Sequence, residues 1–287
     1  MVALPDPRAV VRAGIGALFG SDRFPEEQYD EPLGDEGLFG ADSVTWKVHA
    51  DVSTFVGGIA ALMLQALHPR AARIVSGSSR FREEPFHRLS RTGSFVAATT
   101  YAATPVAEAV IERVRDTHAR IPGASEPDLL TWVHVAEVTS FVAAYRRYAV
   151  RPLGPGDVDR YFAEMVVVAE RLGARDVPRS GREIRAYYER IRPELAASTD
   201  SAELLDFIHR PIGRDPVTRA SHALIVQAAQ AQLPAWAKEL HGISFPPGAD
   251  LLVLRPWTWS LLEALRLSLG SSPVLAAARR RSAAVAR

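Results

Sequence analysis

Two long apolar helical segments limit what this chain can fold into. Residues 43–68 and 125–149 carry apolar side chains at most positions of the helical repeat. A helix that is apolar nearly all round lies in the interior of a protein or in a membrane. The longest apolar run, residues 55–67, is interrupted by Gln65 and is shorter than the roughly 20 residues that a membrane span needs. We therefore expect two core helices and no integral membrane span.

The rest of the sequence also predicts helices. Strand-like alternation is scarce, and we find no hairpin turn signal, internal repeat or low-complexity tract. A chain of 287 residues with 47% hydrophobic residues can bury one large core. We expect an all-α fold with a single compact multi-helix domain over residues 43–270. An N-terminal helix and surface arm (1–42) should precede it, and a flexible basic C-terminal tail (271–287) should follow it.

The charge balance and the lack of cysteine exclude several kinds of function. Lys and Arg number 34 against 33 Asp and Glu, so no overall field attracts nucleic acid. With no cysteine, the chain has no disulfide, thiolate nucleophile or iron–sulfur site. Motifs of nucleotide-binding loops, zinc proteases and serine hydrolases are absent. No secretion signal is evident at the N-terminus, and we expect a cytoplasmic protein without a nucleic-acid partner.

His118 is the best candidate for a metal ligand. A neutral imidazole in an apolar helical bundle is a common axial ligand of heme iron. His118 lies toward the end of a helix whose apolar face points inward, and Arg115, one turn earlier, could pair with a propionate or carboxylate. The alternative is a surface histidine near a helix C-terminus, where the helix dipole favours positive charge.

Three other histidines have simpler interpretations. His68 precedes a proline at a helix end and should hydrogen-bond to free carbonyls there. We expect His87 to be solvated, and His134 to be either a satisfied core histidine or a pocket residue. A di-iron bundle needs Glu-x-x-His on two helices, whereas the chain has it only at Glu84, straddling a proline. The sequence therefore argues against a di-iron site.

Arg88, Arg91 and Thr92 fall on one face of a helix expected to begin at Pro85. A guanidinium donates hydrogen bonds in a planar fork, and a threonine hydroxyl can hydrogen-bond bound dioxygen. The alternative is a solvated basic helix face. Spacing alone leaves both interpretations open.

These residues belong to a longer stretch that resembles a known family of bacterial and fungal oxygenases. The family is related to latex-clearing protein (rubber oxygenase) and to the endoplasmic-reticulum-bound oxygenase of mycophenolic acid biosynthesis. The similarity is carried by LMLQALHPRAARIVSGSSRFREEPFHRLSRT and continues through VIERVRDTHARIPG, DLLTWVHVAEVTSFVAAYRRY, LGPGDVDRYFAEM and PRSGREIRAYY. It covers roughly residues 45–195, and the combination of motifs is more specific than any one of them.

The resemblance implies an all-α fold that encloses a heme b pocket and an oxidation of a hydrophobic, often isoprenoid, substrate by dioxygen. The family's Arg-x-x-His motif supplies the iron ligand, which implies that role for His118, with Arg115 beside the cofactor. The Arg-x-x-basic-Thr motif lines the opposite side of the heme. The resemblance thus assigns catalytic roles to Arg88, Arg91 and Thr92, and contact with heme to Arg88. His134 should form part of the pocket wall.

The chain departs from the rubber oxygenases at two places. They carry a lysine where this chain has Arg91, and a permanently charged guanidinium cannot replace an amine as an iron ligand. The glutamate that they use as a base, upstream of the arginine motif, has no evident equivalent. We therefore expect a small intracellular lipid or secondary metabolite as the substrate rather than an extracellular polymer.

The sequence leaves three kinds of function open. The first is a heme b-dependent oxygenase or oxidase that acts on a small hydrophobic substrate. The second is a non-catalytic protein on the same scaffold that stores or senses heme or a hydrophobic ligand. The third is a helical interaction protein without a cofactor. The sequence does not predict the oligomeric state.

Overall fold

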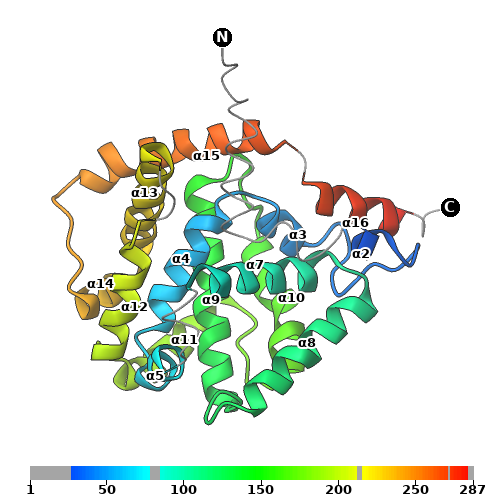
Figure 1. The fold of residues 1–287 in the computed structure, drawn as a ribbon, viewed down its shortest axis with the longest axis horizontal. Helices are drawn as coiled ribbons and strands as arrows, with labels where there is room; N and C mark the ends of the chain where they lie inside the picture. Colours follow the sequence, from blue (N-terminus) through cyan, green and yellow to red (C-terminus); the bar gives the residue numbers. More distant parts are fainter. Residues whose placement is uncertain (1–26, 78–84, 212–214, 271, 284–287) are drawn as a thin grey trace.

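The computed structural model describes residues 27–77, 85–211, 215–270 and 272–283, of which 27, 28 and 85–90 are described through their backbone alone, and every regular element in it is helical (Figure 1). The elements are α2 (Glu27–Asp30), α3 (Val44–His49), α4 (Thr54–Gln65), α5 (Pro69–Ser76), α7 (Pro85–Tyr101), α8 (Thr104–Ala119), α9 (Pro127–Tyr148), α10 (Asp157–Leu172), α11 (Gly181–Ile191), η1 (Arg192–Glu194), α12 (Thr199–His209), α13 (Pro216–Gln232), α14 (Ala235–His241), η2 (Asp250–Leu254), α15 (Arg255–Leu269) and α16 (Pro273–Ala283). The predicted all-α fold is confirmed. The N-terminal helix expected within residues 1–26 lies outside the described residues.

The two predicted core helices, α4 and α9, pack against each other in the middle of the fold (Figure 1). Gly57 allows their close approach, because a Cβ atom there would lie 2.7 Å from Cδ1 and 3.0 Å from Cα of Phe141. Near the other end of the pair, the indole of Trp132 donates a hydrogen bond of 3.1 Å to the carbonyl of Gln65. These contacts fix the position of α9, which carries part of the site described below.

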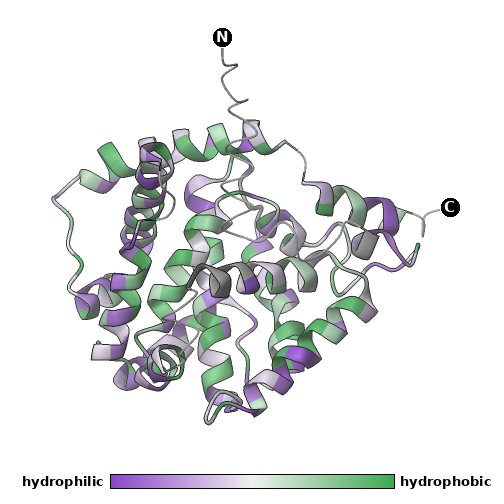
Figure 2. Ribbon diagram, in the orientation of Figure 1, coloured by the Kyte–Doolittle hydropathy of each residue, from purple (hydrophilic) through white to green (hydrophobic). Residues whose placement is uncertain are grey.

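The other helices surround this pair. α13 packs on α4, α12 packs on α5, and α10 contacts α3, α8 and α9. In Figure 2, most of these outer helices carry both hydrophobic and hydrophilic residues, as expected for helices with one face on a core. α7 and α8 are joined by a short turn and form a helical hairpin. In the view of Figure 1, the two helices move apart with distance from this turn.

We predicted one continuous helix over residues 43–68, and this was wrong. The structure divides this range into α3 and α4. Asp51 causes the break: its carboxylate accepts a hydrogen bond of 2.8 Å from the backbone N–H of Ser53, and its carbonyl accepts one from the hydroxyl of Thr54. Such local bonds compete with helical ones. Arg266 of α15 also binds the Asp51 carboxylate, at 2.9 Å, and holds the break in place.

Two predictions about the ends of the chain also need correction. We expected a flexible tail after residue 270, but Pro273–Ala283 forms α16, which packs on α2. Arg281 is fully buried there and donates hydrogen bonds to the backbone carbonyls of Tyr29 and Asp35. The described part of the expected surface arm is not wholly exposed either, since Tyr29 and Phe39 are buried.

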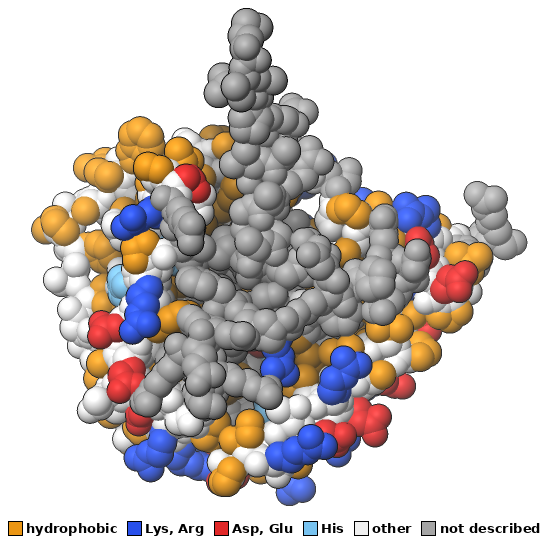
Figure 3. All heavy atoms as spheres, viewed as in Figure 1, with side chains coloured by type: hydrophobic (Ala, Val, Ile, Leu, Met, Phe, Trp, Pro, Cys, Tyr) orange, Lys and Arg blue, Asp and Glu red, His pale blue; other side chains and the backbone are white. Residues whose placement is uncertain are grey.

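The outward face of η2 and α15 is apolar (Figure 3). Its exposed side chains are Leu251, Leu252, Val253, Trp257, Trp259 and Leu267. No single helix in the described part of the chain is long and apolar enough to cross a membrane, while one bent pair, 250–269 with 273–283, reaches the required length and composition.

Candidate functional site

A small cavity of about 60 Å³ lies among α7, α8, α9 and α10. Most of its lining is apolar, and the polar groups are one threonine, two histidines and one glutamate. The described lining residues are Phe95, Val96, Thr99, His118, Leu130, Val133, His134, Glu137, Met165, Val168, Ala169 and Leu172. An apolar chamber with a few polar groups is the usual form of a small-molecule or cofactor site.

The hairpin of α7 and α8 brings together two of the motifs found in the sequence. Because the two helices are joined by residues 102–103, the start of α7 and the end of α8 lie at the same end of the hairpin. At about 1.5 Å per residue, Arg88 and His118 are each roughly 20 Å along their helices from this turn. The arginine–threonine motif and the Arg-x-x-His motif therefore lie at similar distances from the turn between α7 and α8.

His118 is in the last turn of α8, and its side chain lines the cavity. It is partly buried, and its Nδ1 atom is inaccessible to solvent. This placement agrees with the pocket interpretation better than with a histidine on open surface. Arg115, three residues earlier, is exposed and is not among the described lining residues. Its predicted contact with a cofactor stays a prediction.

His134 and Glu137 enter the cavity from α9 and are one helical turn apart. His134 is 7% exposed, and its Nε2 atom has no hydrogen-bond partner within the described residues. Burial lowers the pKa of His134 to about 4, so the ring is neutral at pH 7. Burial raises the pKa of Glu137 to about 7. The cavity therefore contains a neutral imidazole and a carboxyl group that titrates near neutral pH.

Glu137 was not among the predicted site residues. The signal was nevertheless present, because Glu137 is the only carboxylate in the apolar interior of α9. A carboxylate at such a position is costly to bury unless it is neutral or has a partner. Glu137 is partly buried and lines the cavity.

The arginine–threonine motif lies on the helix that forms one wall of the cavity. Thr92 precedes the lining residues Phe95, Val96 and Thr99 by three, four and seven positions, which places it on the same helix face. Arg91 and Thr92 are exposed, one turn beyond the described lining. The Arg88 side chain, like that of His87, lies outside the described side chains, so its predicted role stays a prediction.

His49 is a partly buried histidine that the sequence did not indicate. Its Nδ1 is 2.7 Å from the hydroxyl of Thr100, and its Nε2 is 2.9 Å from the hydroxyl of Tyr161. Thr100 donates to the carbonyl of Val96, at 2.6 Å, so it accepts from Nδ1–H, and Tyr161 donates to Nε2. Burial lowers the pKa of His49 to about 3, which keeps the ring neutral. His49 thus ties α7 to α3 and α10 beside the cavity.

His68 lies away from the cavity, and the hydrogen bonds to helix-end carbonyls that we predicted for it do not form within the described structure. It is buried at the start of α5, but its side chain makes no cap hydrogen bond. Its Nε2 is instead 3.8 Å from the carboxylate of Glu194. Among the described residues, no group of three or more His, Asp or Glu side chains is arranged to hold a bare metal ion.

Comparison with known proteins gives one match. The family described as the catalytic domain of the ER-bound oxygenases mpaB/B′ and rubber oxygenase matches residues 46–264. This range contains all four helices of the cavity and both sequence motifs. No curated protein and no solved structure matches the chain.

Proposed function

The chain belongs to this family of oxygenase catalytic domains, and we propose that it is a heme b-dependent oxygenase or oxidase that acts on a small hydrophobic substrate in the cytoplasm. The observation that carries the proposal is the cavity, in which His118 lies within apolar walls. Heme would need only one imidazole from the protein, because the porphyrin nitrogens supply most of the iron ligands. That the described residues contain no cluster of metal-binding side chains is therefore compatible with heme.

The chemistry of the cavity suits heme. His118 would ligate the iron, and the leucine, valine, methionine and phenylalanine side chains would cover the porphyrin faces. The buried Nε2 of His134, which has no partner in the described structure, would be available for a hydrogen bond to a bound group. Arg88 and Arg115 would pair with the propionates at the more exposed end of the hairpin.

The size of the cavity sets a further condition. A volume of about 60 Å³ holds about two water molecules, whereas small-molecule sites span roughly 300–1,000 Å³. Heme binding would therefore require the helices around the cavity to move apart. His49 and Thr100 hold the last turn of α7, so the displacement would occur in its first half.

Bound heme would supply a redox-active iron that activates dioxygen. The chain would contribute ligation through His118 and water exclusion through the apolar walls. Glu137, with a pKa of about 7, could hold or release a proton at its carboxyl oxygen at physiological pH. Arg88, Arg91 and Thr92 would donate hydrogen bonds at the mouth of the cavity.

Heme reconstitution tests this proposal. The purified chain is titrated with hemin, and the absorption spectrum is followed for a Soret band. We expect stoichiometric binding by the wild type and a loss or large shift of the band in His118→Ala. His209→Ala is the matched control, because His209 is an exposed histidine on α12. A wild-type protein without a Soret band would refute the heme proposal, and an unchanged band in His118→Ala would refute the ligand assignment.

Oxygen uptake then separates an enzyme from a storage protein. The reduced heme-loaded protein is placed in an oxygen electrode with squalene or another isoprenoid. Substrate-dependent uptake supports the oxygenase. Stable heme binding without uptake over a panel of hydrophobic substrates would favour the non-catalytic binding protein.

A further inference from the structure

A second and larger hollow lies where α3, the α9–α10 connection, α15 and α16 meet. Its volume is about 450 Å³, within the range of roughly 300–1,000 Å³ that is typical of small-molecule sites. It shares no lining residue with the His118 cavity. The described lining residues are Ala41, Asp42, Ser43, Trp46, Lys47, Ala50, Asp51, Tyr145, Val150, Arg151, Arg266 and Arg279. We call this hollow the α3–α16 groove.

Two aromatic side chains form the buried part of the groove. Trp46 is 2% exposed and Tyr145 is 4% exposed. The Trp46 ring packs edge-on against Tyr101, with the ring centres 5.3 Å apart. Its Nε1–H is buried and makes no hydrogen bond within the described structure, although a buried indole N–H normally finds an acceptor. The groove therefore has a buried aromatic floor.

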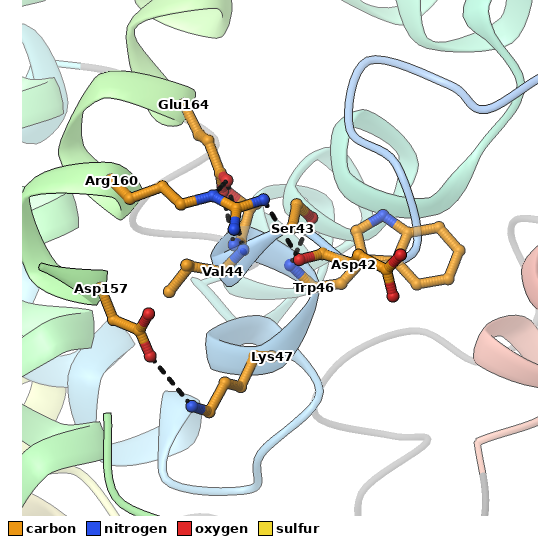
Figure 4. A network of polar contacts seen from close by, with 9 residues as sticks. Asp42, Ser43, Val44, Trp46, Lys47, Asp157, Arg160 and Glu164 are labelled. Carbon is orange, nitrogen blue, oxygen red and sulfur yellow. Dashed lines mark hydrogen bonds and ion pairs between the residues drawn. The ribbon is translucent and has the colours of Figure 1, made fainter. Parts of the chain in front are cut away.

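Side-chain hydrogen bonds hold the backbone at the start of α3, the helix that carries Trp46. Figure 4 shows Glu164 of α10 reaching the start of α3, where it accepts hydrogen bonds from the N–H and hydroxyl of Thr45, at 2.8 and 2.9 Å. Arg160 in turn binds Glu164, at 2.8 Å, and the Ser43 hydroxyl accepts from the Trp46 N–H, at 3.1 Å. The groove thus combines the part of α3 held by these hydrogen bonds with non-helical residues on either side of it.

The charged lining residues are mostly basic. Lys47 and Arg266 are occupied, since Lys47 binds Asp157 at 3.0 Å and Arg266 binds Asp51 at 2.9 Å. Arg151 and Arg279 are both exposed, and neither forms an ion pair within the described residues.

Asp42 is the remaining acid in the lining, and its carbonyl accepts from Arg160 at 3.2 Å. Among the described lining residues, two guanidinium groups and one carboxylate are thus without an ion pair.

We propose that the α3–α16 groove binds a small organic anion with an apolar body. Arg151 and Arg279 pair with a carboxylate or phosphate headgroup, because a guanidinium fork matches both. The apolar body lies against Trp46 and Tyr145. This site is separate from the cavity assigned to heme, so it does not depend on that assignment.

Isothermal titration of the full-length chain with octanoate, octyl phosphate and neutral octanamide tests the proposal. We expect octanoate or octyl phosphate to bind, and octanamide to bind at least about tenfold more weakly. The double variant Arg151→Gln/Arg279→Gln should weaken binding of the anion at least about tenfold. Tighter binding of octanoate would identify the headgroup as a carboxylate, and tighter binding of octyl phosphate would identify it as a phosphate.

The control is Arg182→Gln/Arg185→Gln, which removes the same charge from exposed positions on α11. It should leave the affinity unchanged, and circular dichroism should show both variants folded, because exposed arginines without ion pairs contribute little to stability. The proposal is overturned if neither anion binds the wild type, if octanamide binds as tightly as the anions, or if the two double variants have equal affinity.

Discussion

Replacing Glu137 by glutamine should make the protein more stable at pH 8 while leaving its stability nearly unchanged at pH 4.5. Burial raises the pKa of Glu137 from 4.5 to about 7 in the folded chain. The folded state therefore holds this proton more tightly than the unfolded state does. Wild-type stability should fall as the pH rises from about 4.5 to about 7, because the buried carboxyl must ionise. Glutamine has nearly the same shape and does not ionise.

The size of the effect follows from the shift in pKa. A shift from 4.5 to about 7, at 1.36 kcal/mol per pH unit, corresponds to about 3 kcal/mol. Urea denaturation of the heme-free wild type and of Glu137→Gln at several pH values between 4.5 and 8 gives the difference in free energy of unfolding. His134 and His49, with pKa values of about 4 and 3, reduce the stability of both proteins at acid pH. Their effect cancels in this difference.

Glu112→Gln is the matched control, since Glu112 is exposed on α8. For this variant the difference in free energy should stay nearly constant over the same pH range. A constant difference for Glu137→Gln as well would refute the reasoning, because it would mean that Glu137 experiences no more burial in the folded chain than in the unfolded one.

Three further substitutions test the packing. Gly57→Ala should lower the free energy of unfolding, measured by urea denaturation, by about 1–3 kcal/mol, because its Cβ would lie 2.7 Å from the ring of Phe141. Gly58→Ala is the control and should be tolerated, because its Cβ would lie 3.9 Å from the same ring. Ser198→Ala removes the capping box of α12 and should lower the free energy of unfolding by about 1 kcal/mol in the same assay. A loss below about 0.3 kcal/mol would mean that the cap does not stabilise the helix. Arg281→Met should lower the thermal midpoint and expose α2 to limited proteolysis, because two carbonyls lose their buried donor; Arg279→Met, at an exposed position, should do neither.

The sequence predicted the core helices because their apolar pattern is local and strong. The break after α3 was missed although its signal is local, in the bonds of Asp51 with Ser53 and Thr54. The ion pair of Asp51 with Arg266, 215 residues away, could not be predicted. Helix α16 was missed for a similar reason: its sequence has few large apolar residues, and the partners of Arg281 are backbone carbonyls near the start of the chain. Helix α12 was also overlooked, although the pair Ser198 and Ser201 forms a capping box that marks its start.

Within the candidate site, the residues found from the sequence are those with a short-range signal. His118 follows Arg115 by one turn, and His134 stands out in an apolar helix. His49 carried no such signal, because its hydrogen-bond partners lie 51 and 112 residues away, on helices that approach it only in the folded chain. The network around His49 is a product of the tertiary structure.

The buried contact of Arg281 also bears on how the protein forms during synthesis. Arg281 is made 252 residues after Tyr29, whose carbonyl it binds. At a translation rate of roughly 5–20 residues per second, this interval lasts about 13–50 s. During that time the helices between them are being made, and α2 has no α16 to pack against. The packing of α16 on α2 is therefore a late step of folding. A chain that ends before residue 281 would lack Arg281 and its hydrogen bond to the carbonyl of Tyr29.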